Sequence, residues 1–422
     1  MNTTRHLAVL VVASALAWRC GAEPMRDAAP PTAPIDLPTA IALALDQPAV
    51  RAAAHEAAAT DALVAQADRL PNPTLSYLRE GQQAGLRTTT VQIDQPIELG
   101  GKRRARVALA RGAAALAEGD RLAQRQAVRA DVIAAYYAVL VAGHRLAVAQ
   151  ASLDLARKTV DVTARRVAAG KISPIDETRA RLALVDADTA QDGAAAALAI
   201  ARTTLGALTG RPAEGLVLAD DAVRLPDPEP LAALLARLSD SAALRRARGQ
   251  LAARQAQVDV ERAARVPDVT LSVGTQRDDQ VGKRQTVVGL SVPLPLFDRN
   301  TDALRAALRR TDQAGDELAA AATATQAALT SAHMRYATAR RAAQLLRDDV
   351  VPHAQAAYEQ TLKGFEYGKF SFLDVESAQR TWYGAQSRQW DSVDNAWRAW
   401  ADIERLAGAP ATATATAQRT RN

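Results

Sequence analysis

The feature that most constrains how this chain can fold is a long internal repeat. Leu70-Pro71 returns as Val266-Pro267, an offset of 196 residues from proline to proline. Gly170-Lys171-Ile172-Ser173 returns 198 residues later as Gly368-Lys369-Phe370-Ser371. Landmarks that keep one offset to within two residues over this distance indicate two copies of one structural unit.

The repeat divides the 422-residue chain into parts. We expect a first copy over residues 36–210 and a second copy over residues 236–408. A connector over residues 211–235, rich in Pro and Asp, joins them. Residues 23–35 are expected to form an N-terminal linker. The Ala-Thr repeats within residues 409–422 predict a disordered tail.

Each copy shows the same succession of patterns: a helix, two short strands, a very long helix, a turn and another helix. In the first copy the opening helix is expected from Thr39 to Asp68, because Pro71 and Pro73 follow it. Apolar residues then alternate with small or polar ones, which is the period of a strand. The predicted strands cover residues 73–80, 88–96, 268–276 and 285–293.

After the strands, both copies change to a helical period. The first long helix is expected from Lys102 to Ala168, and the second from Thr301 to Tyr367 with an interruption at Pro352. About 65 residues at ~1.5 Å each make a rod of roughly 100 Å. Frequent alanine lets neighbouring helices approach closely, so we expect packing of the coiled-coil kind.

The far end of each rod has the signals of a tight helical hairpin. Gly170 and Gly368 fit the left-handed position just past a helix end. Ser173 and Ser371 follow as candidate N-caps, each with an aspartate three residues later, which predicts a capping box in both copies. The two hairpins should therefore look alike.

The N-terminus resembles an export signal over residues 1–22. Arg5 and His6 form a short basic region before the apolar stretch Leu7 to Ala17, and small residues allow cleavage after Ala22. Cys20 is the only cysteine. Lipidation of Cys20 is the alternative interpretation, although Arg19 departs from the small residue that a lipidation signal requires.

No later segment holds 18 consecutive apolar residues, so we expect no membrane helix. Contact with a membrane would then require strands closed into a barrel. Four strands per chain are too few, since the smallest barrels use about eight. Other copies must complete the barrel, and a trimer would supply 12 strands.

Composition and motifs exclude several classes of function. The net charge of +6 is spread among acidic residues along helical faces, which indicates a solvated surface and no nucleic-acid partner. The sequence has no phosphate-binding glycine loop, no H-E-x-x-H and no G-x-S-x-G. No two of the five histidines have the usual metal-ligand spacing. We therefore predict no enzyme, no cofactor and no dedicated metal site.

The duplicated plan resembles the TolC-like outer membrane factor family. Local motifs are similar to its heavy-metal cation-efflux (CzcC-type) branch: Leu70-Pro71-Asn72-Pro73 before the first strand, Glu98-Leu99-Gly100-Gly101-Lys102 after the second, and Tyr367-Gly368-Lys369-Phe370-Ser371 at the second hairpin. The resemblance covers about residues 36–408. It implies a mostly α protomer with a small β part, in a trimer with a 12-strand barrel and a periplasmic helical barrel.

The resemblance also implies a location and partners. These are the outer membrane and its lipid, a periplasmic adaptor (membrane fusion protein) and an inner-membrane RND pump that supplies the energy. The chain would be a passive exit duct for heavy-metal cations such as cobalt, zinc or cadmium. The alternatives are an outer membrane factor for drugs or other organic compounds, and a periplasmic adaptor or coiled-coil scaffold.

Site residues follow from the resemblance as well. Asp374 matches an acidic position that rings the closed aperture in relatives. Asp176 is its counterpart in the first copy, and Ser377 stands where relatives have a second acidic residue. The competing interpretation of both aspartates is helix capping alone. Adaptor contacts are expected at the two tips, at Gly170, Lys171, Ser173, Gly368, Lys369 and Ser371. Tryptophans of the last helix are expected to pack between helices.

Overall fold

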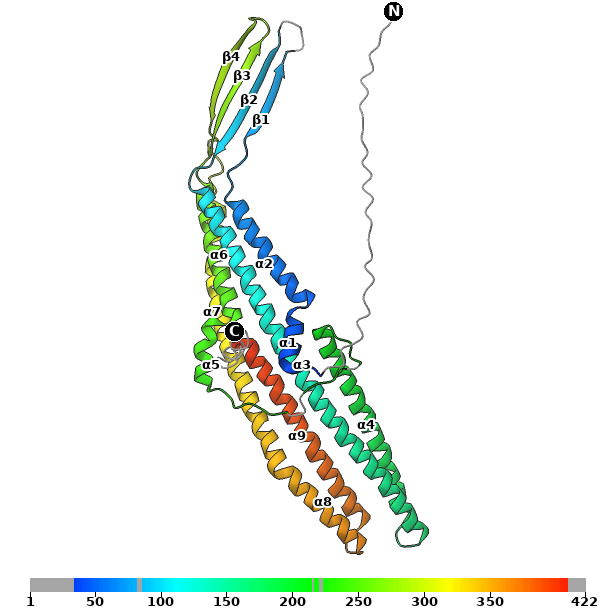
Figure 1. Ribbon diagram of the computed structural model, residues 1–422. Coiled ribbons are helices and arrows are strands. Elements are labelled where there is room, and N and C mark those ends of the chain that lie inside the picture. The colour runs from blue at the N-terminus through cyan, green and yellow to red at the C-terminus, as the bar shows by residue number, and fades with distance from the viewer. Residues whose placement is uncertain (1–33, 82–85, 215, 220–222, 409–422) are drawn as a thin grey trace, which may run out of the picture.

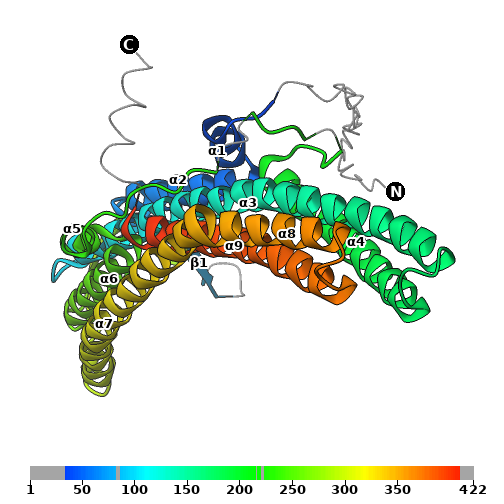
Figure 2. The ribbon, with the colours of Figure 1, turned by 90° about the horizontal axis from the view of Figure 1, so that it is seen from below.

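The computed structural model describes residues 34–81, 86–214, 216–219 and 223–408. The predicted signal peptide, Cys20, most of the N-terminal linker and the predicted tail lie outside these ranges. The described chain is elongated, with a small sheet at one end and two helical hairpins at the other (Figure 1). Seen along its length, the helical part is a curved layer with a convex and a concave side (Figure 2).

Elements follow one another in the same order in both halves of the chain. The first half contains α1 (Leu37–Leu45), α2 (Pro48–Ala67), β1 (Thr74–Glu80), β2 (Thr88–Ile97), α3 (Lys102–Ala168) and α4 (Pro174–Thr209). The second half contains α5 (Leu231–Arg237), η1 (Leu238–Asp240), α6 (Ala242–Ala264), β3 (Val269–Asp278), β4 (Lys283–Ser291), α7 (Thr301–Leu345), η2 (Leu346–Val350), α8 (Val351–Glu366) and α9 (Phe372–Ala407).

The opening helix of the first half is two helices, so the expectation of one helix from Thr39 to Asp68 is wrong. The chain breaks at Gln47, whose backbone is extended at φ −72° and ψ 155°. Pro48 is the cause, because its ring disfavours the helical conformation of the residue before it. Pro48 itself starts α2, at a position where its missing N–H costs nothing.

The second long helix is interrupted where Pro352 predicted it. Residues Leu346–Val350 form a π-helical segment, and Pro352 lies in the first turn of α8. Proline cannot donate the hydrogen bond of a regular helix, and the wider turn ahead of it accommodates the loss. By contrast, α3 is continuous over 67 residues.

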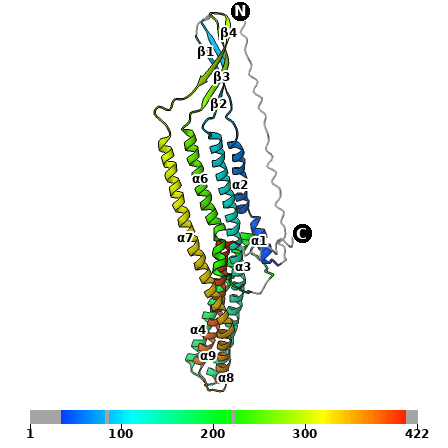
Figure 3. The ribbon, with the colours of Figure 1, turned by 90° about the vertical axis from the view of Figure 1, so that its left-hand side faces the viewer.

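The four strands form one antiparallel sheet in the order β1-β2-β3-β4. The central pairing of β2 with β3 joins the two halves of the chain, with Ile93 opposite Val273. Below the sheet, α7, α6, α3 and α2 lie side by side (Figure 3). Farther from the sheet, α3 packs with α4 and α9, and α8 packs with α9.

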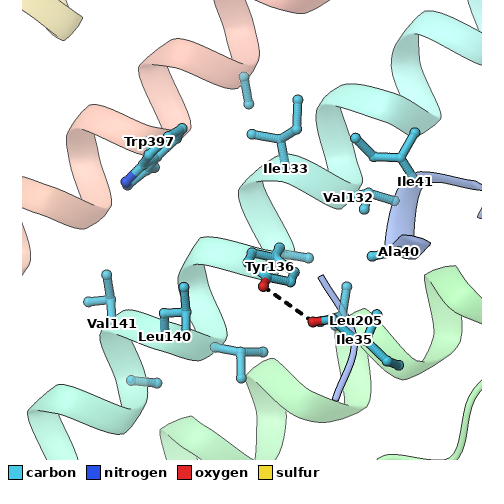
Figure 4. Close-up of a cluster of buried hydrophobic side chains, with 14 of the residues drawn as sticks. Ile35, Ala40, Ile41, Val132, Ile133, Tyr136, Leu140, Val141, Leu205 and Trp397 are labelled. Atoms are coloured by element: carbon cyan, nitrogen blue, oxygen red, sulfur yellow. Dashed lines mark hydrogen bonds between the residues drawn. The ribbon is translucent and has the colours of Figure 1, made fainter. Parts of the chain in front are cut away.

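The largest core cluster surrounds the middle of α3 (Figure 4). Tyr136 is 1% exposed, and its hydroxyl donates a 3.3 Å hydrogen bond to the carbonyl of Ile35. Leu205 of α4 is completely buried in the same cluster. Because α1, α3, α4 and α9 all contribute side chains, this cluster fixes the two halves of the helical part to each other.

The corner between sheet and helices is held by ion pairs. Lys102 Nζ lies 2.8 Å from an Asp268 carboxylate oxygen, which links the start of α3 to the residue just before β3. Arg106 pairs with Glu98, and one of its NH groups donates to the carbonyl of Arg69 at 3.1 Å. These contacts set the direction in which the sheet leaves the helical layer.

Within the described ranges, α3 contains an 18-residue stretch that is apolar enough to cross a membrane by length and composition. In the structure 44% of that stretch is buried. A helix at the centre of a protein core passes the same test, so the stretch is weak evidence for a membrane span.

Candidate functional site: the open sheet and the helical tips

One face of the sheet is apolar and uncovered. Its central row runs across all four strands in direct register, through Leu75, Ile93, Val273 and Val288. These side chains are 71%, 53%, 51% and 69% exposed, respectively. Water does not favour so much contiguous apolar surface, so this face requires an apolar environment.

The opposite face of the sheet is polar and is organised around Asp94. The Asp94 carboxylate accepts hydrogen bonds from Ser76 at 3.1 Å, from Gln92 at 3.0 Å and from Ser272. Strands β1, β2 and β3 are thus tied together on this side by one carboxylate. A sheet with one apolar and one hydrogen-bonded polar face suits a boundary between lipid and water.

Both edges of the sheet are open in the described chain. Strand β1 pairs only with β2, and β4 pairs only with β3. Each outer strand therefore presents a row of backbone N–H and C=O groups without strand partners. Such edges are sites where further chains pair.

At the other end of the molecule, both hairpins turn through the same backbone motif. Gly170 and Gly368 have φ of 67° and 73°, the left-handed region that glycine adopts without strain. The N–H of Lys171 donates to the Arg166 carbonyl at 2.9 Å, and that of Lys369 to the Gly364 carbonyl at 2.7 Å. These bonds define a Schellman motif at each tip.

The helices that leave the tips are capped differently, which corrects the expectation of two capping boxes. Ser371 and Asp374 form a complete box. In the first hairpin the Ser173 hydroxyl accepts from the N–H of Ile175, and no reciprocal bond from Asp176 forms. Pro174 follows Ser173 directly, and Asp176 pairs instead with Arg179 at 3.7 Å.

The predicted aperture residues lie in the first turns of α4 and α9. Asp374 is exposed, and its carboxylate accepts from the N–H and the hydroxyl of Ser371 at 2.8 and 2.7 Å. The hydroxyl and the N–H of Ser371 lower the pKa of Asp374 below its ordinary value of 3.8. Ser377 is exposed one turn farther along. The capping role of Asp374 is thus visible in one chain, whereas a gate needs several chains.

The two hairpins pack against each other behind their tips. Phe365 of α8 and Phe372 of α9 are buried at 8% and 5% exposure. The Arg166 guanidinium lies over the Phe365 ring, 4.2 Å from its centre. Lys171 and Lys369 remain exposed. The adaptor-contact residues predicted from sequence are therefore at the free end of the molecule.

Tryptophans of α9 pack between helices, which confirms that expectation. Trp397 stacks on Tyr137 of α3 with ring centres 3.3 Å apart and an interplanar angle of 7°. Trp390 stacks on His144, with centres 4.1 Å apart. Sequence reasoning missed the ion pairs beside them, such as Arg129 with the buried Glu404 at 2.9 Å. A separation of 275 residues left no local signal for that pair.

No group of three or more His, Cys, Asp or Glu side chains within the described residues could hold a metal ion. His353 lies 3.1 Å from Asp349, one turn away on the same helix. His333 contacts the Glu229 carbonyl at 3.0 Å. Both histidines are thus engaged by neighbouring groups of the helical scaffold.

An amphipathic open sheet at one end of a long helical rod is the architecture of an outer membrane channel protomer. The chain belongs to the outer membrane efflux protein family, whose model matches residues 41–211 and 236–409. It is therefore an outer membrane efflux channel, located in the outer membrane. The match covers the two halves of the chain separately.

Among individual relatives, the chain is 37% identical to the cobalt-zinc-cadmium resistance protein CzcC of Cupriavidus metallidurans. That alignment spans 377 residues, 89% of this chain and 90% of the relative. It is 30% identical over 267 residues to the nickel-cobalt-cadmium resistance protein NccC of Alcaligenes xylosoxydans, covering 62% of this chain and 60% of that one.

Solved channels share the fold. The outer membrane protein VceC of Vibrio cholerae superposes with a TM-score of 0.75 at 19% identity, over 88% of this chain and 96% of that one. CusC superposes with a TM-score of 0.74 at 16% identity, over 89% and 92% of the two chains. Sequence identities this low support a shared fold and no further conclusion.

Proposed function

We propose that this chain is the exit duct of a tripartite efflux system for heavy-metal cations. Three copies would form a barrel of 12 strands in the outer membrane and a helical tunnel through the periplasm. An inner-membrane RND pump would supply the energy, and a periplasmic adaptor would connect the pump to the duct. The chain itself then needs no cofactor, because it moves nothing by its own chemistry.

The observation that carries this proposal is the four-stranded sheet. Its apolar face is uncovered, its other face is polar, and neither edge is paired within the described chain. Lipid excludes open strand edges, because their backbone groups would remain without hydrogen bonds. Copies of the same chain can close the edges, since β1 and β4 would meet as neighbours around a ring.

The helical tips supply the proposed docking and gating surfaces. Lys171 and Lys369 would contact the adaptor, together with the exposed Gly170, Ser173, Gly368 and Ser371. Asp374, Asp176 and Ser377 would line the aperture where three protomers converge. A ring of carboxylates at a constriction favours cations. Capping and gating are compatible, because a capping carboxylate keeps its charge.

The proposed cargo rests on the relatives. The printed names of CzcC and NccC state resistance to cobalt, zinc, cadmium and nickel, and CzcC aligns along nearly the whole chain. We therefore assign divalent heavy-metal cations as the cargo. Organic compounds, the alternative cargo, become one outcome of the test.

A deletion strain tests the proposal. We expect hypersensitivity to one or more of zinc, cadmium, cobalt, nickel and copper, and ordinary tolerance of dyes and antibiotics. Sensitivity to organic compounds alone would still support an efflux duct, but it would contradict heavy-metal cations as the cargo. A protein found in the soluble periplasmic fraction would instead favour the adaptor or scaffold class.

Complementation of that strain tests the tips. The double variant Lys171→Glu/Lys369→Glu reverses two exposed charges at the tips and should fail to restore resistance, although the protein still reaches the outer membrane. The matched control Arg305→Glu/Arg309→Glu makes the same charge change near the sheet, on exposed residues of α7, and should restore it. Equal complementation by both variants would contradict adaptor contact at the tips.

A further inference from the structure

Three arginines form one row across the sheet, on the same face as the apolar side chains. Arg79 of β1 lies opposite Thr89 of β2, Thr89 opposite Arg277 of β3, and Arg277 opposite Arg284 of β4. All three arginine residues are exposed. Strands in a sheet are ~4.8 Å apart, so the three guanidinium groups share a strip only about 15 Å wide at the backbone. We call these three residues the arginine row.

The arginine row is electrostatically unfavourable by itself. Like charges directly opposite each other on neighbouring strands repel, and Arg277 and Arg284 are such a pair. Asp279 offsets part of this charge through a 3.3 Å ion pair with Arg277. Within the described residues, no carboxylate forms an ion pair with Arg79 or Arg284. Glu80, Asp278 and Lys283 occupy alternate positions, so their side chains leave the other face of the sheet.

The position of the row coincides with a boundary. Along β2, Ile97 to Thr89 spans roughly 26 Å at ~3.3 Å per residue, close to the ~25 Å apolar band of outer membrane barrels. Apolar side chains predominate along this band, and the arginine row marks its end farthest from the helices (Figure 1). An arginine on the lipid face costs little at the interface and several kcal/mol only at the midplane.

We propose that the arginine row binds the phosphate groups of phosphorylated lipid headgroups at the outer rim of the barrel. This inference rests on the proposed function, which places that end of the sheet in the outer leaflet. Phosphate matches the planar donor fork of arginine, and it supplies the counter-charge that the row lacks. A ring of three chains would present nine such arginines around its circumference.

The test uses the full-length channel extracted in detergent, with lipid A, a glycolipid with two phosphates, as the probe. The triple variant Arg79→Gln/Arg277→Gln/Arg284→Gln removes the row. A second variant, Arg79→Gln/Arg284→Gln, keeps the Arg277–Asp279 pair in case its loss disturbs the turn. The matched control Arg305→Gln/Arg309→Gln/Arg310→Gln removes equal charge from the exposed surface of α7. Retention of lipid A is measured by native mass spectrometry, with phosphatidylcholine and inorganic phosphate as parallel probes.

We expect lipid A affinity to fall about fivefold per arginine removed and on the order of 100-fold for the triple variant, as expected for basic residues at an anionic lipid surface. The control should bind as wild type does, and phosphatidylcholine should not distinguish the variants. Equal retention of lipid A by wild type and both row variants would overturn the inference. Competition by millimolar inorganic phosphate alone would show a free-anion site and contradict a lipid surface. If wild type did not reach the outer membrane, the proposed function would fail instead.

Discussion

The two helical hairpins share a backbone and differ in their side chains. Both end in a Schellman motif around a left-handed glycine. The first hairpin then has an incomplete cap and a partly exposed Ile172, whereas the second has a full capping box and Phe370 packed on Gly364. The two hairpins share one turn geometry because the chain reverses direction in both. The side-chain contacts that support the turn differ between them.

The same contrast extends along the helices that leave the tips. Trp397 of α9 is 5% exposed, while the equivalent position of α4, 198 residues earlier, is the exposed Ala199. At this position the second hairpin is thus anchored by a large aromatic side chain, whereas the first hairpin presents a small exposed one. We expect the second hairpin to be more sensitive to substitution than the first.

Truncation of Trp397 should have the largest effect on stability. Trp397→Ala removes a buried ring that stacks on Tyr137, and removal of such a ring costs ~3–5 kcal/mol. The matched change Ala199→Ser at the equivalent position should be nearly neutral. Thermal unfolding of the purified channel measures both. Similar melting temperatures for the two variants would contradict the proposed difference in sensitivity between the two hairpins.

Gly364 should have the next largest effect. A Cβ there would lie 2.1 Å from the Phe370 ring, so Gly364→Ala must displace that ring at about 1–3 kcal/mol. Phe370→Ala in the same chain should recover most of this loss, because it removes the obstacle. Gly193→Ala in α4 of the first hairpin, where an added Cβ meets nothing within 4 Å, serves as the control. Additive effects of the two second-hairpin changes would show that ring and glycine are not coupled.

Removal of the N-cap hydroxyls of α9 and α4 should have smaller effects on stability, and these effects should differ between the two hairpins. Ser371→Ala removes the hydroxyl of a complete capping box and should cost about 1 kcal/mol. Ser173→Ala removes one 3.3 Å bond and should cost roughly half as much. Hydrogen exchange of the tip amides in α9 and α4 measures the two effects separately. A larger effect in α4 would reverse the predicted order.

The smallest expected effect is a pH dependence of the stability of the first turn of α9, at the tip of the second hairpin. The pKa of Asp374 is lowered in the folded state, from an ordinary value of 3.8, by its bonds to Ser371. Its contribution is therefore fully present above that ordinary value and is lost as the pH falls through the folded-state pKa. Asp374→Asn should weaken amide protection at the start of α9 at pH 7 and make little difference once the pH lies below the folded-state pKa of Asp374. Protection that is unchanged at pH 7 would argue against the capping role.

Much of the architecture followed from local signals in the sequence. Gly170, Gly368 and Ser371 marked the tips because each residue type meets a local backbone requirement. The helix Lys102–Ala168 has the bounds expected from its period. The break before α2 was readable from Pro48 and was missed, since the periodicity continues across it. The π-helical segment occupies the turn directly before Pro352.

Other features could not be predicted from the sequence, because they depend on which distant residues meet in the folded chain. The arginine row exists only because β2 pairs with β3 in one particular register, which a single sequence does not specify. The pair of Arg129 with Glu404 joins positions 275 residues apart, and the corner pair of Lys102 with Asp268 also joins distant parts of the sequence. The incomplete cap at Ser173 was not predicted, because Ser173 and Asp176 have the same types and spacing as Ser371 and Asp374, which do form the box.

We propose that copies of this chain complete the open sheet. Native mass spectrometry of the channel, extracted from outer membranes in mild detergent, gives the number of copies. We expect a single species with the mass of three mature chains, and no folded monomer. A stable, folded single chain that retains its four-stranded sheet in the membrane would show that the sheet needs no further copies.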